Sequence, residues 1–277
     1  MRVTPRVCAV SYLNTAPLVW GLAHGPQRGL VELEFATPAD CAEKLRCAEV
    51  DAALVPTIEL ARQPDLAVVP RGCIACDGAV RSILLICKKP FDAVESIAID
   101  QGSRTSVVLV QILALELHGT RPAVLPHAPQ LDEMLQAADA ALIIGDPALR
   151  LDPEMLEWRG QPVHVYDLGT EWKALTGLPM VFAVWAANRL DDPEALVAAL
   201  TGSAAYGLDR IEEVVLAESS RQGFEADFLR KYLTHDIRYA FTAAERRAMD
   251  TYLRLATGQG LVQAPSAIRY LSDFLPA

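Results

Sequence analysis

The fold is decided by residues 99–113, Ile99-Asp100-Gln101-Gly102-Ser103-Arg104-Thr105-Ser106 followed by Val107-Val108-Leu109-Val110-Gln111-Ile112-Leu113. Residues 96–99 before the turn predict a short buried strand, and the apolar run after Ser106 is too long for one strand and predicts a helix. A strand, a hydroxyl-rich turn and a helix in this order direct free backbone N–H groups and the positive end of the helix dipole at one point. The stretch therefore predicts a site for a phosphate or a carboxylate.

The polar residues of this turn have two interpretations. In the functional one, the hydroxyls of Ser103, Thr105 and Ser106 and the charge of Arg104 hold the anion. In the structural one, Ser103 or Thr105 only caps the helix and Arg104 is solvated.

The bulk composition restricts the function. The chain has 277 residues, of which 52% are hydrophobic, and a formal net charge of −10. The negative charge argues against nucleic-acid binding, and an anionic ligand must be captured by local donors. No apolar run has the length of a membrane span, and the N-terminal apolar residues predict a strand and not a signal peptide. We expect a cytoplasmic protein without a nucleic-acid or membrane partner.

Predicted strands and helices alternate along the chain, which favours an α/β fold with mainly parallel sheets. Residues 73–75 and 80–87 are predicted as two strands joined by a tight turn at Asp77-Gly78. The composition changes at Lys88-Lys89-Pro90, where we expect a first crossing between two lobes, and the strand 180–185 is the predicted return. This divides the chain into a larger discontinuous lobe, 1–88 and 186–277, and a smaller inserted lobe, 89–185.

Polar residues follow several predicted strands. Asn14 stands between the first strand and a helix opened by Pro17, and Asp146 follows Gly145 at the end of the apolar strand 140–144. In open α/β sheets, ligands bind at such carboxyl ends of strands. We expect the turns at Asn14, Ser82, Ser103–Ser106 and Asp146 to face one cleft.

The cysteines suggest no cofactor site. All six lie in the first third of the chain, and only Cys73 and Cys76 have CxxC spacing. A tetrahedral zinc site needs further ligands that the sequence does not supply nearby. We expect reduced, partly buried thiols.

Several motifs, taken in order, resemble the chorismate dehydratase family of the futalosine route to menaquinone. The match runs from about residue 6 to residue 188. The motifs are Ser11-Tyr12-Leu13-Asn14-Thr15-Ala16-Pro17-Leu18, Asp51-Ala52-Ala53-Leu54-Val55-Pro56, Asp77-Gly78-Ala79-Val80-Arg81-Ser82, Ser103-Arg104-Thr105-Ser106, Ile144-Gly145-Asp146 and Tyr166-Asp167-Leu168-Gly169.

The resemblance implies a type II periplasmic-binding-protein-like fold, in which two lobes enclose a ligand cleft. It also implies that the protein converts chorismate to 3-[(1-carboxyvinyl)oxy]benzoate with no metal or organic cofactor. A sister family that makes 1,4-dihydroxy-6-naphthoate opens with a Ser-Pro-Cys-Pro-Asn-Asp type stretch, whereas this chain has Ser11-Tyr12-Leu13-Asn14. That difference favours the dehydratase.

For this reaction the protein must hold the two carboxylates of chorismate, orient its ring hydroxyl and allow a ring proton to be removed. We expect Asn14 to orient the elimination and Asp146 to be the acidic candidate for the base, although Asp146 has the alternative role of a helix cap. The substrate's own side-chain carboxylate is the other candidate for proton acceptor. The expected substrate-binding residues are Ser11, Arg81, Ser82, Ser103, Arg104, Thr105, Ser106 and Gly145.

Two other functions remain open from the sequence. One is a non-catalytic cytosolic protein that binds a small carboxylate, because the fold does not fix the function. The other is the sister 1,4-dihydroxy-6-naphthoate synthase. The oligomeric state does not follow from the sequence.

Overall fold

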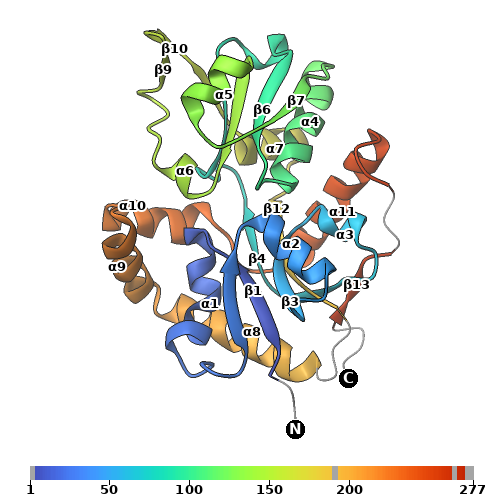
Figure 1. Cartoon of the computed structure of the whole chain (residues 1–277), viewed down its shortest axis with the longest axis vertical. Helices are drawn as coiled ribbons and strands as arrows, with labels where there is room; N and C mark the ends of the chain where they lie inside the picture. Colours follow the sequence, from blue (N-terminus) through green and yellow to red (C-terminus); the bar gives the residue numbers. More distant parts are fainter. Residues whose placement is uncertain (1–3, 189–192, 264–266, 272–277) are drawn as a thin grey trace.

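The computed structural model describes residues 4–188, 193–263 and 267–271 (Figure 1). The first of two main sheets has the strand order β13-β4-β12-β3-β1-β2. β1 pairs in parallel with β2 and β3, whereas β12 is antiparallel to β3 and β4. The strands are β1 (Arg6–Val10), β2 (Glu32–Ala36), β3 (Ala52–Pro56), β4 (Ala67–Cys76), β12 (Met180–Ala187) and β13 (Arg269–Tyr270).

The second sheet has the order β11-β5-β8-β6-β7. β6 pairs in parallel with β7 and β8, whereas β5 is antiparallel to β8 and β11. Its strands are β5 (Ile83–Cys87), β6 (Ser96–Asp100), β7 (Ala123–His127), β8 (Ala140–Ile144) and β11 (His164–Asp167), and a separate pair is formed by β9 (Glu157–Trp158) and β10 (Gln161–Pro162).

Helices cover both sheets and fill the connections. They are η1 (Leu13–Thr15), α1 (Ala16–His24), α2 (Pro38–Arg46), α3 (Glu59–Arg62), η2 (Phe91–Ala93), α4 (Thr105–His118), α5 (Leu131–Ala137), α6 (Asp146–Leu149), α7 (Leu168–Thr176), α8 (Pro193–Asp209), α9 (Ile211–Gln222), α10 (Ala226–Lys231), the π-helical turn η3 (Tyr232–Asp236) and α11 (Ala243–Gly258). Among the described residues, each helix is too short or too polar to span a lipid bilayer.

The chain changes sheet at points that differ from the predicted boundaries at residues 88 and 185. β4 ends at Cys76 in the first sheet and β5 already belongs to the second, so the first crossing runs through residues 77–82. The return lies between α7 and β12, at residues 177–179. The predicted hairpin at Asp77-Gly78 is therefore wrong. An apolar strand such as Ile83–Cys87 fits either sheet equally well, and its hydrophobic pattern does not say which sheet it joins.

The C-terminal helices join the two lobes. α8 packs on α1, and α11 packs on β12 and on α4 of the second lobe (Figure 1). Thr242 and Glu245 form a capping box at the start of α11. From the middle of α11, the Tyr252 hydroxyl donates to the Thr105 carbonyl at 2.9 Å, and this bond fixes the start of α4.

Candidate active site

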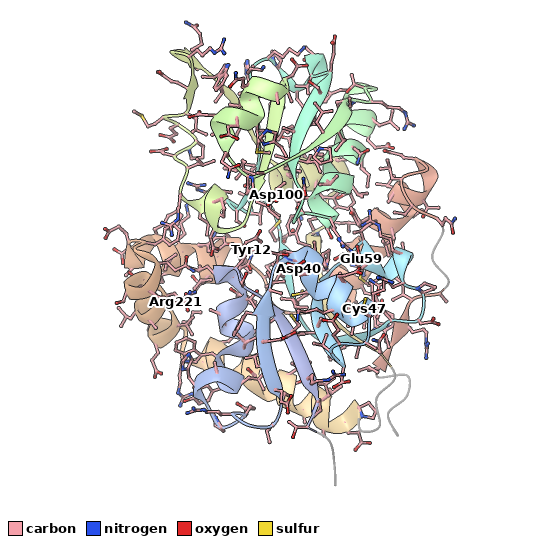
Figure 2. The ribbon with its side chains drawn as sticks, viewed as in Figure 1. Tyr12, Asp40, Cys47, Glu59, Asp100 and Arg221 are labelled. Atoms are coloured by element: carbon pink, nitrogen blue, oxygen red, sulfur yellow. The ribbon has the colours of Figure 1, made fainter. Side chains whose placement is uncertain are left out.

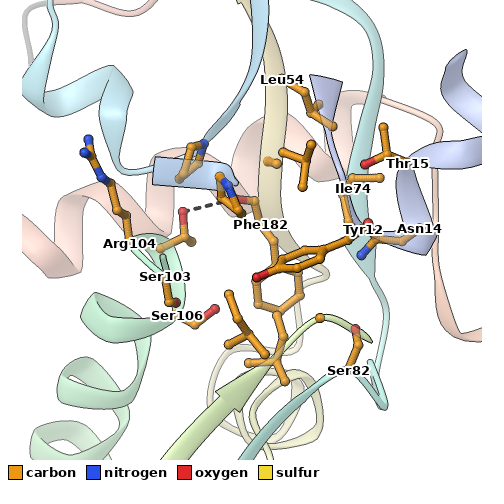
Figure 3. A pocket seen from close by; sticks show the side chains of 18 of the residues that line it. Tyr12, Asn14, Thr15, Leu54, Ile74, Ser82, Ser103, Arg104, Ser106 and Phe182 are labelled. Carbon is orange, nitrogen blue, oxygen red and sulfur yellow. Dashed lines mark hydrogen bonds between the residues drawn. The ribbon is translucent and has the colours of Figure 1, made fainter. Parts of the chain in front are cut away.

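A pocket opens between the two sheets at the carboxyl ends of β1, β3 and β8. It contains about 550 Å³ of empty space, counting its open mouth, which lies in the usual range for small-molecule sites. Its lining is mostly apolar; polar side chains stand on both sides of it, and the Tyr12 ring lies between them (Figure 3). The lining residues are Val10, Tyr12, Asn14, Thr15, Pro38, Leu54, Pro56, Ile74, Val80, Ser82, Ile83, Ser103, Arg104, Thr105, Ser106, Ile144, Gly145, Phe182 and Ala183.

The residues Ser103–Ser106, here called the helix wall, form one side of the pocket. They lead into the 14-residue helix α4, and Arg104, which precedes it, makes no side-chain capping bond. The first N–H groups of a helix have no intrahelical acceptor. The Ser103 Oγ is buried and has no hydrogen-bond partner among the described residues. A buried hydroxyl without a partner costs about 1–3 kcal/mol, so this wall favours a ligand that supplies an acceptor.

Two residues of the helix wall also have structural partners. The Thr105 hydroxyl donates to the Phe182 carbonyl at 3.0 Å and accepts from the Ile58 N–H at 3.4 Å. Arg104 forms an ion pair with the buried Glu59 at 3.1 Å, and its side chain is directed away from the Tyr12 ring (Figure 3). The full charge of Arg104 is therefore shared with a carboxylate, and the backbone N–H groups and serines remain to hold an anion.

A β-bulge brings Phe182 into the pocket. The register of β12 against β4 shifts between Val181 and Ala183, which leaves Phe182 as the extra residue. Its carbonyl accepts from the Thr57 N–H at 3.0 Å as well as from the Thr105 hydroxyl. Bulges often change the direction of a side chain beside an active site. Here the carbonyl of the bulged residue also links β12 to the end of β3 and to α4.

Asn14 and Thr15 form the opposite side of the pocket. They follow β1 in the 3-10 turn η1, and both are buried. The Thr15 Oγ1 is a second buried hydroxyl without a partner among the residues described. Thus unpartnered hydroxyls lie on both lobes, Thr15 after β1 and Ser103 before α4.

Asn14, Ser82 and Tyr232, here called the tyrosine network, are joined by hydrogen bonds. The Asn14 Nδ2 donates to the Tyr232 hydroxyl at 3.2 Å, and that hydroxyl donates to the Ser82 Oγ at 2.9 Å. Burial, the largest influence, raises the pKa of the Tyr232 phenol, so it is neutral at physiological pH. Sequence reasoning missed Tyr232, because the π-helical turn that presents it has no recognised motif.

Gly145 and Tyr12 are packed against each other across the two lobes. The Gly145 N–H donates to the Ser82 carbonyl at 2.7 Å. Gly145 has φ +67° and ψ −147°, and a Cβ there would lie 2.7 Å from the Tyr12 ring. Burial, followed by the charges of Asp100 and Asp146, raises the pKa of Tyr12. Tyr12 and Asp100 lie near the junction of the two lobes (Figure 2).

Three predicted site residues do not line the pocket. Ser11 is exposed, next to the lining residue Tyr12. The Arg81 backbone has φ +65°, its N–H donates to Asp167 Oδ2 at 2.7 Å, and its guanidinium donates to the Ala148 and Leu151 carbonyls. Arg81 thus has a left-handed backbone conformation, and its side chain binds backbone carbonyls outside the pocket lining. The sequence indicates neither feature.

Asp146 is the third of these residues. Its Oδ1 accepts from the Leu13 N–H at 3.0 Å and its Oδ2 accepts from the Gln222 Nε2 at 3.2 Å. Burial raises the pKa of Asp146, and the bonds to Leu13 and Gln222 oppose that change. The carboxylate thus joins α6 to η1 and α9, outside the set of lining residues.

The CxxC cysteines have no common site. Cys73 and Cys76 are both buried in β4, and burial raises the pKa of each thiol. Residues three apart on a strand point to opposite faces. The residues that the structure describes contain no group of three His, Cys, Asp or Glu side chains arranged to hold a metal ion.

Known proteins resemble this chain over most of its length. A family profile described as "Menaquinone biosynthesis" matches residues 5–257. A chorismate dehydratase from Thermus thermophilus is 34% identical over 266 residues, covering 92% of this chain and 94% of that protein.

Solved structures show the fold. A protein from Archaeoglobus fulgidus is similar with a TM-score of 0.74 at 16% identity, covering 93% of this chain and 98% of that one. The periplasmic aliphatic sulphonate binding protein of Escherichia coli is similar with a TM-score of 0.60 at 16% identity, covering 99% and 94%. The periplasmic-binding-protein-like fold predicted from the sequence is confirmed.

Proposed function

We infer that this chain, which belongs to the menaquinone biosynthesis family, is a chorismate dehydratase. It is a hydro-lyase: chorismate loses its ring hydroxyl and the proton of the neighbouring ring carbon, a net loss of one water. The product is the aromatic acid 3-[(1-carboxyvinyl)oxy]benzoate. The aromatic ring makes the reaction strongly downhill, so the protein's task is to bind and orient the substrate.

The observation that supports this substrate most directly is the pair of unpartnered hydroxyls on opposite sides of one pocket. The Ser103 Oγ and the Thr15 Oγ1 are buried without partners among the described residues, and the lining between them is mostly apolar. Chorismate has polar groups, two carboxylates and a hydroxyl, around a carbon ring. A ligand of this kind supplies partners on both sides and fills the middle, which removes the cost of the buried hydroxyls.

The helix wall holds one carboxylate in our proposal. Its donors are the Ser103 and Ser106 hydroxyls and the N–H groups of the first turn of α4, with the positive end of the helix dipole behind them. Arg104 contributes less, because Glu59 lies 3.1 Å from its guanidinium. This arrangement explains how an acidic protein, with a formal net charge of −10, binds an anion.

Asn14 and Ser82 orient the reacting part of the ring. Both line the pocket on the side opposite the helix wall, and each has one hydrogen bond to Tyr232 that fixes its direction. Orientation of this kind contributes about 7–11 kcal/mol in favourable cases.

In this proposal the side-chain carboxylate of the substrate itself takes up the proton. The carboxyl group so formed gives the proton to the departing hydroxide, which restores the carboxylate and releases one water. The described residues that line the pocket include no Asp, Glu, His or Lys side chain. Asp146, whose two oxygens accept hydrogen bonds from Leu13 and Gln222, positions η1 against α6 and does not act as the base. The carboxyvinyl carboxylate is attached to the carbon that loses the proton through a short ether arm, so it reaches that proton within the bound substrate.

We place the protein in the cytoplasm, with a small anionic substrate as its only proposed partner. Its relation to a biosynthetic enzyme supports this location.

The test is turnover of chorismate by the purified protein, without added cofactor or metal, followed by chromatography and mass. We expect an aromatic product lighter by one water. Unchanged chorismate that nevertheless raises the melting temperature would support a non-catalytic carboxylate-binding protein. Unchanged chorismate without binding would overturn the proposal and lead to tests of the sister naphthoate synthase.

A further inference from the structure

The hydroxyl of Tyr232 is placed between two side chains of the pocket that come from distant parts of the chain. Asn14 follows β1 in the first lobe, and Ser82 lies in the crossing before β5. The Tyr232 hydroxyl is 3.2 Å from the Asn14 Nδ2 and 2.9 Å from the Ser82 Oγ. The tyrosine itself is 1% exposed and does not line the pocket. Its influence on a ligand must therefore pass through Asn14 and Ser82.

A phenol hydroxyl has one proton, so when it makes two hydrogen bonds it donates one and accepts the other. When Tyr232 donates to Ser82, it accepts from the Asn14 amide. The Asn14 Oδ1 is then left to accept a hydrogen bond from the ligand. The Ser82 hydroxyl makes only a long bond, 3.4 Å, to the Val80 carbonyl, and it can donate to the ligand instead. The reverse direction would leave Ser82 an acceptor, which repels a carboxylate.

We propose that Tyr232 is a positioning residue of the dehydration, which sets the Asn14 amide as an acceptor for the ring hydroxyl and the Ser82 hydroxyl as a donor to the substrate. This inference rests on the proposed function. Without the phenol oxygen, the Asn14 amide loses its fixed orientation and the Ser82 proton loses its preferred direction.

Among the described residues, two other buried tyrosines, Tyr239 and Tyr252, do not bond to polar side chains as Tyr232 does. The Tyr239 hydroxyl is buried without a hydrogen-bond partner in the described part of the chain. The Tyr252 hydroxyl donates to the backbone of Thr105 and not to a side chain. Tyr232 also begins the π-helical turn η3, and such turns are frequent at functional sites. Tyr239 is thus a matched control, because it is also buried and lies seven positions away in sequence.

The first experiment compares Tyr232→Phe with Tyr239→Phe in chorismate turnover. Misorientation of a reacting group lowers the rate constant roughly 10- to 100-fold, so we expect kcat of Tyr232→Phe to fall by about that factor while KM changes by less than about threefold. Tyr239→Phe should retain wild-type kinetics. Equal kinetics for the two variants, both folded by circular dichroism, would overturn the proposal.

The second experiment asks whether Tyr232 acts through Ser82. The affinity for the product, 3-[(1-carboxyvinyl)oxy]benzoate, is measured by calorimetry for Tyr232→Phe, Ser82→Ala and the double variant. We expect Tyr232→Phe to weaken product binding by no more than about threefold in the wild-type background and to have a smaller effect when Ser82 is already alanine, because residues in one network do not act additively. Additive effects would overturn the proposal. If the wild type binds the product but does not turn over chorismate, the proposed function fails while this cycle still tests the network.

Discussion

The helix wall and the tyrosine network face each other across one pocket but are built in different ways. The helix wall consists of four consecutive residues, Ser103–Ser106, and its donors follow from the local passage of strand into helix. The tyrosine network joins residues 218 positions apart, Asn14 and Tyr232, through side chains alone. The first is an anion site that many folds form, whereas the second depends on the complete tertiary structure. We therefore expect the helix wall to contribute mainly to affinity and the tyrosine network mainly to rate.

The largest effect is expected where the network and the second lobe meet, at Gly145. Gly145→Ala places a Cβ 2.7 Å from the Tyr12 ring, in a backbone conformation that is essentially limited to glycine. The Gly145 bond to the Ser82 carbonyl would then shift, and we expect kcat/KM to fall by more than about 100-fold.

The matched control is Gly119→Ala. Gly119 also has φ +67°, but a Cβ there meets nothing within 4 Å. This variant should lose about 1–2 kcal/mol of stability, the cost of a side chain in the left-handed conformation, and keep its kinetics. Wild-type turnover by folded Gly145→Ala would show that the contact with Tyr12 does not shape the site.

Asn14→Ala is the next largest expected change. It removes the acceptor for the ring hydroxyl and leaves the Tyr232 hydroxyl without its donor. We expect kcat to fall roughly 100-fold, measured by product formation with the fold checked by circular dichroism. Asn188→Ala serves as control, because the Asn188 Nδ2 donates to the Leu45 carbonyl at 2.7 Å and neither residue lines the pocket. A folded Asn14→Ala with near-normal kcat would remove Asn14 from the mechanism.

Ser103→Ala tests the helix wall and should act on KM. Because the Ser103 Oγ has no partner in the described structure, its removal should leave the melting temperature unchanged or slightly higher. One lost hydrogen bond to a charged group, about 1.5–3 kcal/mol, should raise KM roughly 10- to 100-fold.

Thr201→Val is the control for this combination of unchanged stability and raised KM. The Thr201 Oγ1 is also buried, without a partner in the part of the chain that the structure describes, and it lies in α8 outside the pocket lining. Its removal should likewise preserve stability, but KM should not change. A higher KM for Thr201→Val, or an unchanged KM for Ser103→Ala, would contradict the assignment of the carboxylate to the helix wall.

The smallest kinetic effect is expected for Asp146→Asn. An asparagine still accepts from the Leu13 N–H, and we expect kcat to stay within about threefold of wild type if the substrate supplies the base. A loss of more than about 100-fold in a folded variant would make Asp146 the base.

The same variant has a predicted pH signature. Burial raises the pKa of folded Asp146, so its stabilising contribution is complete below the ordinary aspartate pKa, about 3.9, and is lost as the pH rises through the raised value. As the pH rises from about 3.9 through the raised pKa, the melting temperature of wild type should therefore fall relative to that of Asp146→Asn, and at higher pH the difference should stay constant. Parallel profiles would show that Asp146 titrates as it does in the unfolded chain.

The difference between the two sides also explains what the sequence could predict. Ser103–Ser106 and Asn14 follow apolar strands, and that local pattern was enough to place them in the pocket. Arg81 and Asp146 also stand beside strands, but backbone geometry and distant partners determine where their side chains go. Tyr232 was missed, because its function comes from two contacts with Asn14 and Ser82 and from no pattern around it.

The points where the chain crosses between the two sheets also depend on contacts between residues distant in sequence. The strand Ile83–Cys87 is buried on both faces, so its sequence is uniformly apolar and carries no sign of its neighbours. Its place in the second sheet follows from pairing with β8 and β11, which are 50 or more residues further along the chain.

The most direct test of the two-sided pocket is a crystal structure with 3-[(1-carboxyvinyl)oxy]benzoate bound. One carboxylate should lie within hydrogen-bond distance of the Ser103 Oγ and the first N–H groups of α4, and the other polar end should contact Asn14 or Ser82. A product molecule bound elsewhere, or one whose carboxylates both avoid the helix wall, would contradict the account.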